Sequence, residues 1–109
     1  MALLLALLPF ALQAQPGHGA DCATLEGIGK ARCERHQRMF GKCSPIKGEA
    51  HLDCDRDFLI ANPLDCVPHK GADRTACVAE REALVVCRGQ GGRGFFECMM
   101  ERLRTDPRH

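Results

Sequence analysis

The chain has 109 residues with 15 basic and 14 acidic side chains, so its formal net charge is only +1. A nearly neutral chain with five Phe and no Trp or Tyr has neither the charge that attracts nucleic acid nor many rings on which bases stack. It does contain eight cysteines, an even and high number for its length. In a small exported protein such a count predicts a disulfide framework.

The first segment, "MALLLALLPFALQA", is almost wholly apolar. It is shorter than the roughly 20 residues of a membrane-spanning helix, so no membrane span is expected, but it is typical of a signal peptide. Ala14 supplies the small residue of a cleavage site. We therefore expect a signal peptide over 1–14, a flexible segment over 15–21, and a secreted or periplasmic protein.

The cysteines reveal an internal repeat. They stand at positions 22, 33, 43, 54, 66, 77, 87 and 98, so that gaps of 11, 10 and 11 residues occur twice. Residues 22–54 and 66–98 are therefore two copies of one unit, offset by 44 residues. We expect one domain over 22–105, followed by a short tail over 106–109.

Each copy contains two segments of the form C-x4-G-x5-C. Their glycines tolerate positive φ, and two of the segments have a proline two residues after the first cysteine, so we predict turns rather than helices there. The turn glycines are Gly27, Gly48, Gly71 and Gly92.

The stretches between the turns have the spacing of amphipathic helices. In chain order, helices are expected after Gly29, Gly48, Gly71 and Gly94. Asp21 is a candidate cap for a short turn before the first helix, and Asp73 for the third helix. The prediction is an all-α fold, a small disulfide-stapled antiparallel helical array or bundle with four helices in two repeated hairpins.

The position of each turn glycine also bears on the cysteine pairing. Cysteines that flank one short turn are brought together by it, which favours sequential bonds. The predicted pairs are Cys22–Cys33, Cys43–Cys54, Cys66–Cys77 and Cys87–Cys98. The alternative is a twin C-x9-C hairpin with Cys22–Cys54 and Cys33–Cys43 bonds, which would require helices that continue through Gly27 and Pro45.

The fourth turn, "CRGQGGRGFFEC", contains the G-x-G-x-x-G spacing of a dinucleotide-binding loop. Such a loop needs a βαβ unit and an acidic residue about 20 positions further on, whereas only 15 residues follow Gly94. The chain also lacks a C-x-x-C pair and a nucleophile elbow. We therefore expect no catalytic residue, no cofactor-binding residue and no cofactor.

Metal binding is the main chemical alternative. Asp53, Asp55 and Asp57 resemble the start of an EF-hand, but Phe58 and Leu64 stand where its Gly and Glu must be. Reduced cysteines could instead line a Cu(I) store. The side chains that could assist are His36, Met39, His51, Met99 and Met100. Oxidation after export argues against metal binding.

The segments "CRGQGGRGFFECMM" and "CVPHKGADRTACV" resemble Golgi-type cysteine-rich repeat proteins, in which cysteines bracket a Gly-Gly-Arg turn and an apolar residue follows. The likeness covers the two C-terminal turns. It implies a lumenal or exported helical repeat that binds other proteins, with no catalytic residues to carry over.

The sequence thus favours an exported, non-enzymatic module that binds a protein partner or has a structural role. Copper storage through thiols and an enzyme without a recognisable motif are the alternatives. The series Arg32, Arg35, Arg38 and Lys42 is expected to form a solvated helix face, with a partner-binding face as the second interpretation.

Overall fold

The computed structural model describes residues 21–108. They form four helices: α1 (Gly27–Cys43), α2 (Glu49–Ala61), α3 (Gly71–Cys87) and α4 (Gly92–Thr105). A single 3-10 turn, η2 (Cys22–Thr24), precedes α1, and the Asp21 carboxylate caps it by accepting a hydrogen bond from the Ala23 amide at 2.9 Å. The described part of the chain has no strand, and the predicted all-α class is confirmed. The expected signal peptide lies outside the described residues.

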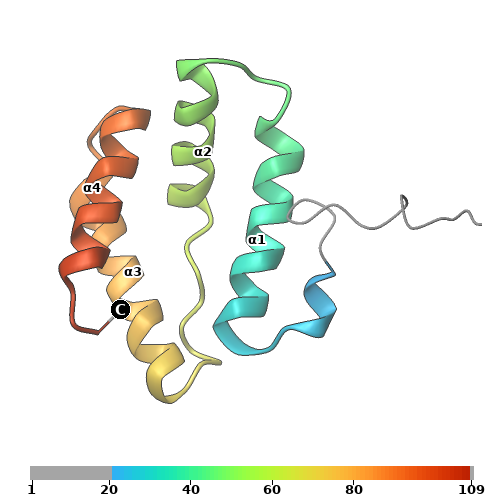
Figure 1. Ribbon diagram of the computed structural model, residues 1–109, viewed down its shortest axis with the longest axis vertical. Helices are drawn as coiled ribbons and strands as arrows, with labels where there is room; N and C mark the ends of the chain where they lie inside the picture. Colours follow the sequence, from blue (N-terminus) through green and yellow to red (C-terminus); the bar gives the residue numbers. More distant parts are fainter. Residues whose placement is uncertain (1–20, 109) are drawn as a thin grey trace, which may run out of the picture.

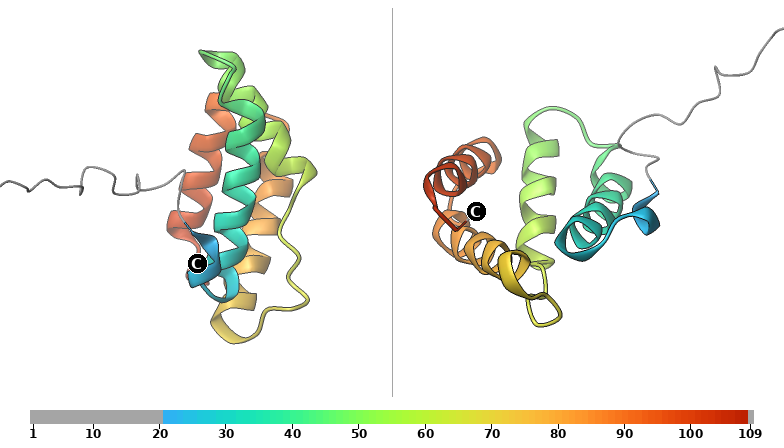
Figure 2. Two further views of the ribbon diagram at one scale, coloured as in Figure 1. Left: turned by 90° about the vertical axis from the view of Figure 1, so that its right-hand side faces the viewer. Right: turned by 60° about the horizontal axis from the view of Figure 1, so that its bottom comes forward.

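The helices form two antiparallel hairpins, α1 with α2 and α3 with α4 (Figure 1). The hairpins stack because α2 packs against α4 and α1 packs against α3. Figure 2 shows the result as an open array, with α2 between α1 and the second hairpin. A linker of residues 62–70 returns the chain from the end of α2 to the start of α3.

The four disulfides are the sequential pairs, and they are of two kinds. Two of them join the helices of one hairpin, Cys43–Cys54 and Cys87–Cys98. The other two join the segment before a helix to that helix, Cys22–Cys33 to α1 and Cys66–Cys77 to α3. The C-x9-C segments are helical, as the twin-hairpin alternative assumed, but their cysteines bond outward to different neighbours.

The first helix starts three residues earlier than predicted. α1 begins at Gly27 rather than after Gly29, so the expected turn is already helical there. Its first amides have no capping side chain nearby in sequence, and Asp73 of α3 supplies one by accepting a hydrogen bond from the Ile28 amide at 3.1 Å. Asp73 therefore caps α1, not its own helix as expected.

The last helix also starts earlier than predicted. α4 begins at Gly92 rather than after Gly94, and Asp53 of α2 caps it by accepting a hydrogen bond from the Gly92 amide at 2.8 Å. Gly27, Gly48 and Gly71 adopt positive φ, whereas Gly92 does not. A Cβ atom on Gly92 would lie 2.6 Å from the Leu52 carbonyl carbon, so glycine is needed there for close helix contact.

The core is divided into two clusters. The first lies inside the second hairpin and contains Ala83, Leu84, Cys87, Phe95 and Met99. The second lies between α1, the linker and α3, and contains Ile28, Leu64, Cys66 and Cys77. Helix α2 has no buried residue, so the first hairpin has no comparable apolar centre of its own.

Candidate functional site

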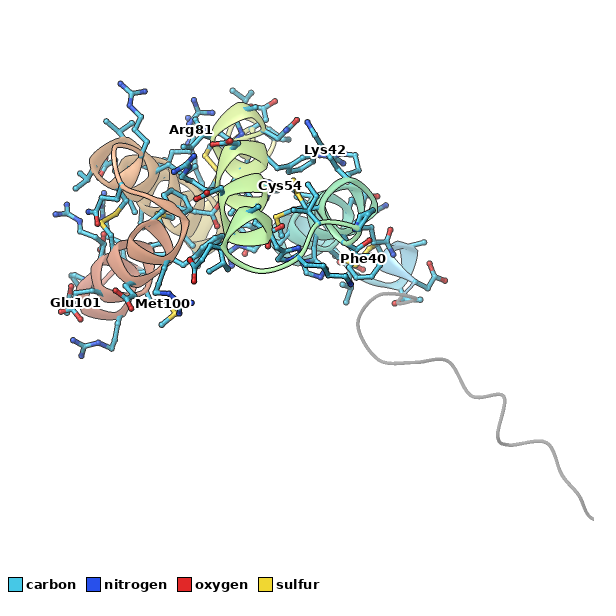
Figure 3. All side chains as sticks on the ribbon, turned by 90° about the horizontal axis from the view of Figure 1, so that it is seen from above. Phe40, Lys42, Cys54, Arg81, Met100 and Glu101 are labelled. Carbon is cyan, nitrogen blue, oxygen red and sulfur yellow. A yellow bond between two sulfur atoms is a disulfide. The ribbon has the colours of Figure 1, made fainter. Side chains whose placement is uncertain are left out.

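The cysteines offer no ligands for a soft metal in this state. All eight are bonded in pairs, which leaves no thiolate for Cu(I). Met99 is buried in the core, whereas its neighbour Met100 projects outward from α4 (Figure 3), so these two methionines do not converge. Within residues 21–108 no group of three or more His, Cys, Asp or Glu side chains is placed to hold a metal ion.

The three aspartates that resemble an EF-hand lie on α2, and each has a protein partner. Asp53 caps α4, and the Asp57 carboxylate lies 2.8 Å from the Arg56 guanidinium. Asp55 lies 3.1 Å from Nε2 of His51, whose Nδ1 lies 2.8 Å from the Cys43 carbonyl oxygen. These side chains therefore serve as a helix cap (Asp53), the partner of an arginine (Asp57) and the partner of a histidine (Asp55).

The predicted solvated face of α1 is wrong at Arg35. This side chain is buried, and its Nη2 lies 2.8 Å from Oε1 of Glu80 on α3. Arg32 reaches the other carboxylate oxygen of Glu80 at 3.3 Å. A buried Arg is stable only beside a counter-ion, and that counter-ion comes from the second repeat, where sequence spacing gave no signal for it.

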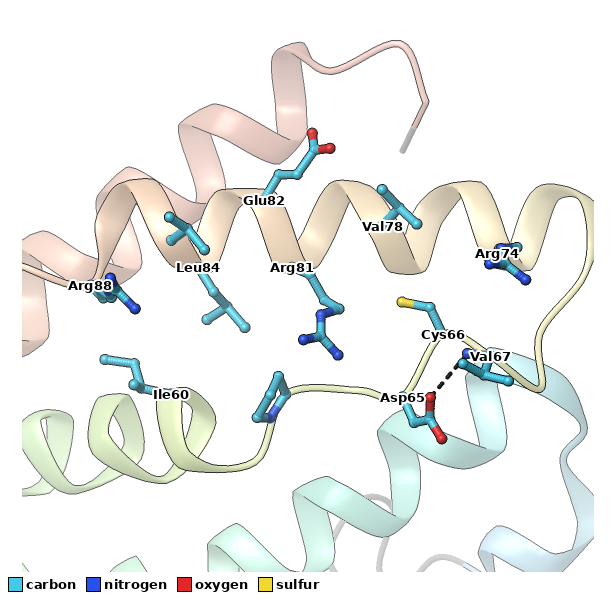
Figure 4. Close-up of a pocket in the computed structure, with 12 residues that line it drawn as sticks. Ile60, Asp65, Cys66, Val67, Arg74, Val78, Arg81, Glu82, Leu84 and Arg88 are labelled. Carbon is cyan, nitrogen blue, oxygen red and sulfur yellow. Dashed lines mark hydrogen bonds between the residues drawn. The ribbon is translucent and has the colours of Figure 1, made fainter.

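A groove of about 490 Å³ lies between α3 and the chain that runs from the end of α2 into the linker (Figure 4). We call it the α3 groove. Its apolar side chains are Ile60, Pro63, Val67, Val78, Leu84 and Val85. Val67 and Val85 are 73% and 61% exposed, so part of the apolar surface of the groove is open to solvent.

Three arginines line the α3 groove along one side of the helix. Arg74, Arg81 and Arg88 are spaced seven residues apart, so they share a face of α3 and follow one another at about 10 Å intervals (Figure 4). Arg81 is held in place because its Nη1 donates a hydrogen bond to the Leu64 carbonyl oxygen at 2.9 Å. Among the described residues, Arg74 and Arg88 have no carboxylate within ion-pair distance.

Two acidic side chains also line the α3 groove. Glu82 is occupied by Arg108, which lies 2.6 Å away and holds the pKa of the Glu82 carboxyl below its ordinary value, mainly through their hydrogen bond. Asp65 accepts a hydrogen bond from the Val67 amide at 3.0 Å. The groove thus keeps an excess of positive charge on the arginine side.

Comparison with protein-family models, curated proteins and solved structures gives no significant match. The likeness to Golgi-type cysteine-rich repeats stays a prediction. None of the helices in the described range is long and apolar enough to cross a membrane.

Only one wall of the α3 groove has a pattern in the sequence, so the groove was not predicted. The arginine spacing was visible in "RTACVAEREALVVCR", where a basic residue recurs at every seventh position. The other wall comes from the linker, whose position beside α3 depends on the Cys66–Cys77 bond and is known only from the fold.

Proposed function

We propose that this protein is an exported, non-enzymatic module that binds a protein partner in the α3 groove. The observation that carries the proposal is the groove itself, which combines exposed apolar side chains with a row of cations. Protein interfaces commonly combine an apolar centre with a polar rim, and arginine is enriched in them.

One disulfide supports this function because it joins the two walls of the groove. Cys66–Cys77 attaches the linker to α3. The Arg81 hydrogen bond to Leu64 joins the same two walls near the middle. A preformed groove has little conformational entropy to lose on binding, which favours affinity.

Export is supported by the state of the cysteines. Four disulfides in a domain of this size are typical of an oxidising compartment, and the apolar segment at the start of the sequence is consistent with entry into one. Copper storage through thiols would require these bonds to be broken first.

Site-specific photo-crosslinking in the native compartment tests the proposal. A photoreactive residue is placed at Val85 in the groove or, as a matched control, at Met100, which is 68% exposed on α4. We expect one discrete protein adduct from position 85 and none from position 100, and Val85→Asp should abolish binding of that partner while Met100→Asp should not. Equal adducts from both positions, or none from position 85, would contradict the proposal.

A further inference from the structure

We infer that the occupant of the α3 groove is an acidic amphipathic helix of the partner protein. This inference rests on the proposed function and specifies the chemistry of the segment that binds. Three features of the groove support it: the spacing of side chains along α3, the charges of the lining residues, and the length of the arginine row.

The apolar side chains of α3 repeat with the same period as its arginines. Val78 and Val85 are seven residues apart, and they form a stripe beside the row that starts at Arg74. Residues at a seven-residue interval stay on one face of a helix, which is the pattern of a helix that packs lengthwise against another helix. A partner helix can repeat its own contacts at the same interval and so match this stripe at every second turn.

The charges select an acidic partner. Glu82 is already paired with Arg108, and Asp65 accepts a hydrogen bond from the Val67 amide but forms no ion pair with the three arginines among the described residues. Arg74 and Arg88 remain at the two ends of the row as cations without an ion-pair partner among the described residues. Carboxylates of a partner that reach these ends would form ion pairs at the rim and speed association.

The length of the row argues against other anionic occupants. Fourteen residues of helix separate Arg74 from Arg88, which corresponds to roughly 21 Å. The single headgroup of a fatty acid cannot reach both ends. An extended peptide advances about 3.3 Å per residue, so carboxylates about 10 Å apart would be three residues apart and would point to opposite faces. A helix with an acidic residue at every seventh position meets all three arginines from one face.

The test uses a designed helical peptide of about three heptads, with leucines on one stripe and glutamates at every seventh position beside it. A matched peptide has lysines in place of those glutamates. Binding of each labelled peptide to the oxidised protein is measured by fluorescence anisotropy at low salt. We expect the glutamate peptide to bind and the lysine peptide to bind at least tenfold more weakly. Added salt should weaken binding of the glutamate peptide, because these charges are exposed.

Two protein variants test whether the groove arginines, rather than the overall charge of the protein, account for peptide binding. The double variant R74Q/R88Q should weaken binding of the glutamate peptide by about tenfold, as expected for the loss of two exposed ion pairs. The control R93Q/R104Q removes the same number of arginines from α4, where both are exposed, and should leave binding unchanged. Arg81 is not replaced because it also holds the linker. Circular dichroism before and after each measurement verifies that the variants are folded.

The outcomes distinguish this inference from the proposed function. Suppose that Val85 gives crosslinks. Equal binding of both peptides, no binding of either, or no effect of R74Q/R88Q would then overturn the inference of an acidic helix but leave the groove as a binding site. Binding to phosphatidylglycerol vesicles that R74Q/R88Q abolishes, without binding of the glutamate peptide, would overturn it in favour of a lipid surface. Failure of the crosslinking test alone would count against the proposed function.

Discussion

The two hairpins share one disulfide and glycine framework but differ in what fills it. Phe95 and Met99 of α4 are buried in the apolar cluster of the second hairpin. The positions 44 residues earlier in α2 hold His51 and Asp55, which are half-buried polar side chains whose Nε2 and carboxylate oxygen lie 3.1 Å apart. The same place in the repeat is therefore apolar in one copy and polar in the other.

The long helices α1 and α3 differ in the same way. Ala79 of α3 is buried, and its equivalent in α1 is Arg35, which is buried only because Glu80 lies beside it. Leu84 is buried, and its equivalent Phe40 is 38% exposed. The two hairpins thus follow the same helix path with different interiors: the second has its own apolar core, and the first packs against α3 and α4.

The test with the largest expected effect replaces each of the equivalent residues Phe95 and His51 with Ala. Phe95→Ala removes a fully buried ring that packs edge-to-face on Phe96, and should lower the free energy of unfolding by about 4 kcal/mol. His51→Ala removes polar contacts of a half-buried side chain and should cost about 1 kcal/mol. Chemical denaturation of both variants measures the difference, and equal losses would show that the first hairpin has a hidden core.

The second test removes one hairpin bond at a time, with C43A/C54A compared with C87A/C98A. Both bonds span 11 residues, so the chain-entropy model expects a similar loss of about 3 kcal/mol from each. The remaining packing differs, and we expect α2 to lose hydrogen-exchange protection in C43A/C54A while α4 keeps much of its own in C87A/C98A. The comparison fails if α4 loses protection as completely as α2.

The third test compares two turn glycines. Gly92→Ala would place a methyl group 2.6 Å from the backbone of Leu52, which should cost about 3 kcal/mol because the helices α2 and α4 must separate. Gly48→Ala meets no neighbour within 4 Å but strains a backbone with φ of 68° and ψ of −149°, a conformation essentially restricted to glycine, so about 2 kcal/mol is expected. Thermal unfolding followed by circular dichroism ranks the two variants. The reverse ranking would contradict close packing at Gly92.

Much of the fold could be predicted because it depends on short-range spacing. The cysteine gaps and turn glycines indicated four helices in two hairpins, since a turn of a few residues leaves few alternatives for the helices on either side. The starts of α1 and α4 were missed because their caps, Asp73 and Asp53, come from other helices. A capping rule based on neighbouring residues cannot find such a donor–acceptor pair.

The site was harder to predict for the same physical reason. Only the α3 side of the groove has a pattern in the sequence. The opposite side, which contains Val67, is an irregular linker that a disulfide holds beside α3. Likewise, Arg35 belongs to a regular basic series in the sequence, and only its contact with Glu80 shows that it is buried. Contacts between segments that are distant in the sequence therefore determine which of these side chains are buried and which line the groove.

The smallest expected effect concerns an exposed ion pair of the second hairpin, in contrast with the buried Arg35–Glu80 pair that joins the two hairpins. Arg108 lowers the pKa of the Glu82 carboxyl, first through their hydrogen bond and then through its charge, while Asp106 opposes this shift. Because the folded-state pKa is depressed, the associated stability is present above the unfolded pKa and is lost as pH falls through the folded value. Titration of the Glu82 carboxyl by NMR should therefore give a pKa below its ordinary value, and Arg108→Gln should raise it towards that value. Arg104→Gln, which removes the exposed pair with Glu101, should leave Glu82 unchanged. A Glu82 pKa that does not respond to Arg108→Gln would show that this contact does not hold the end of the chain against α3 in solution.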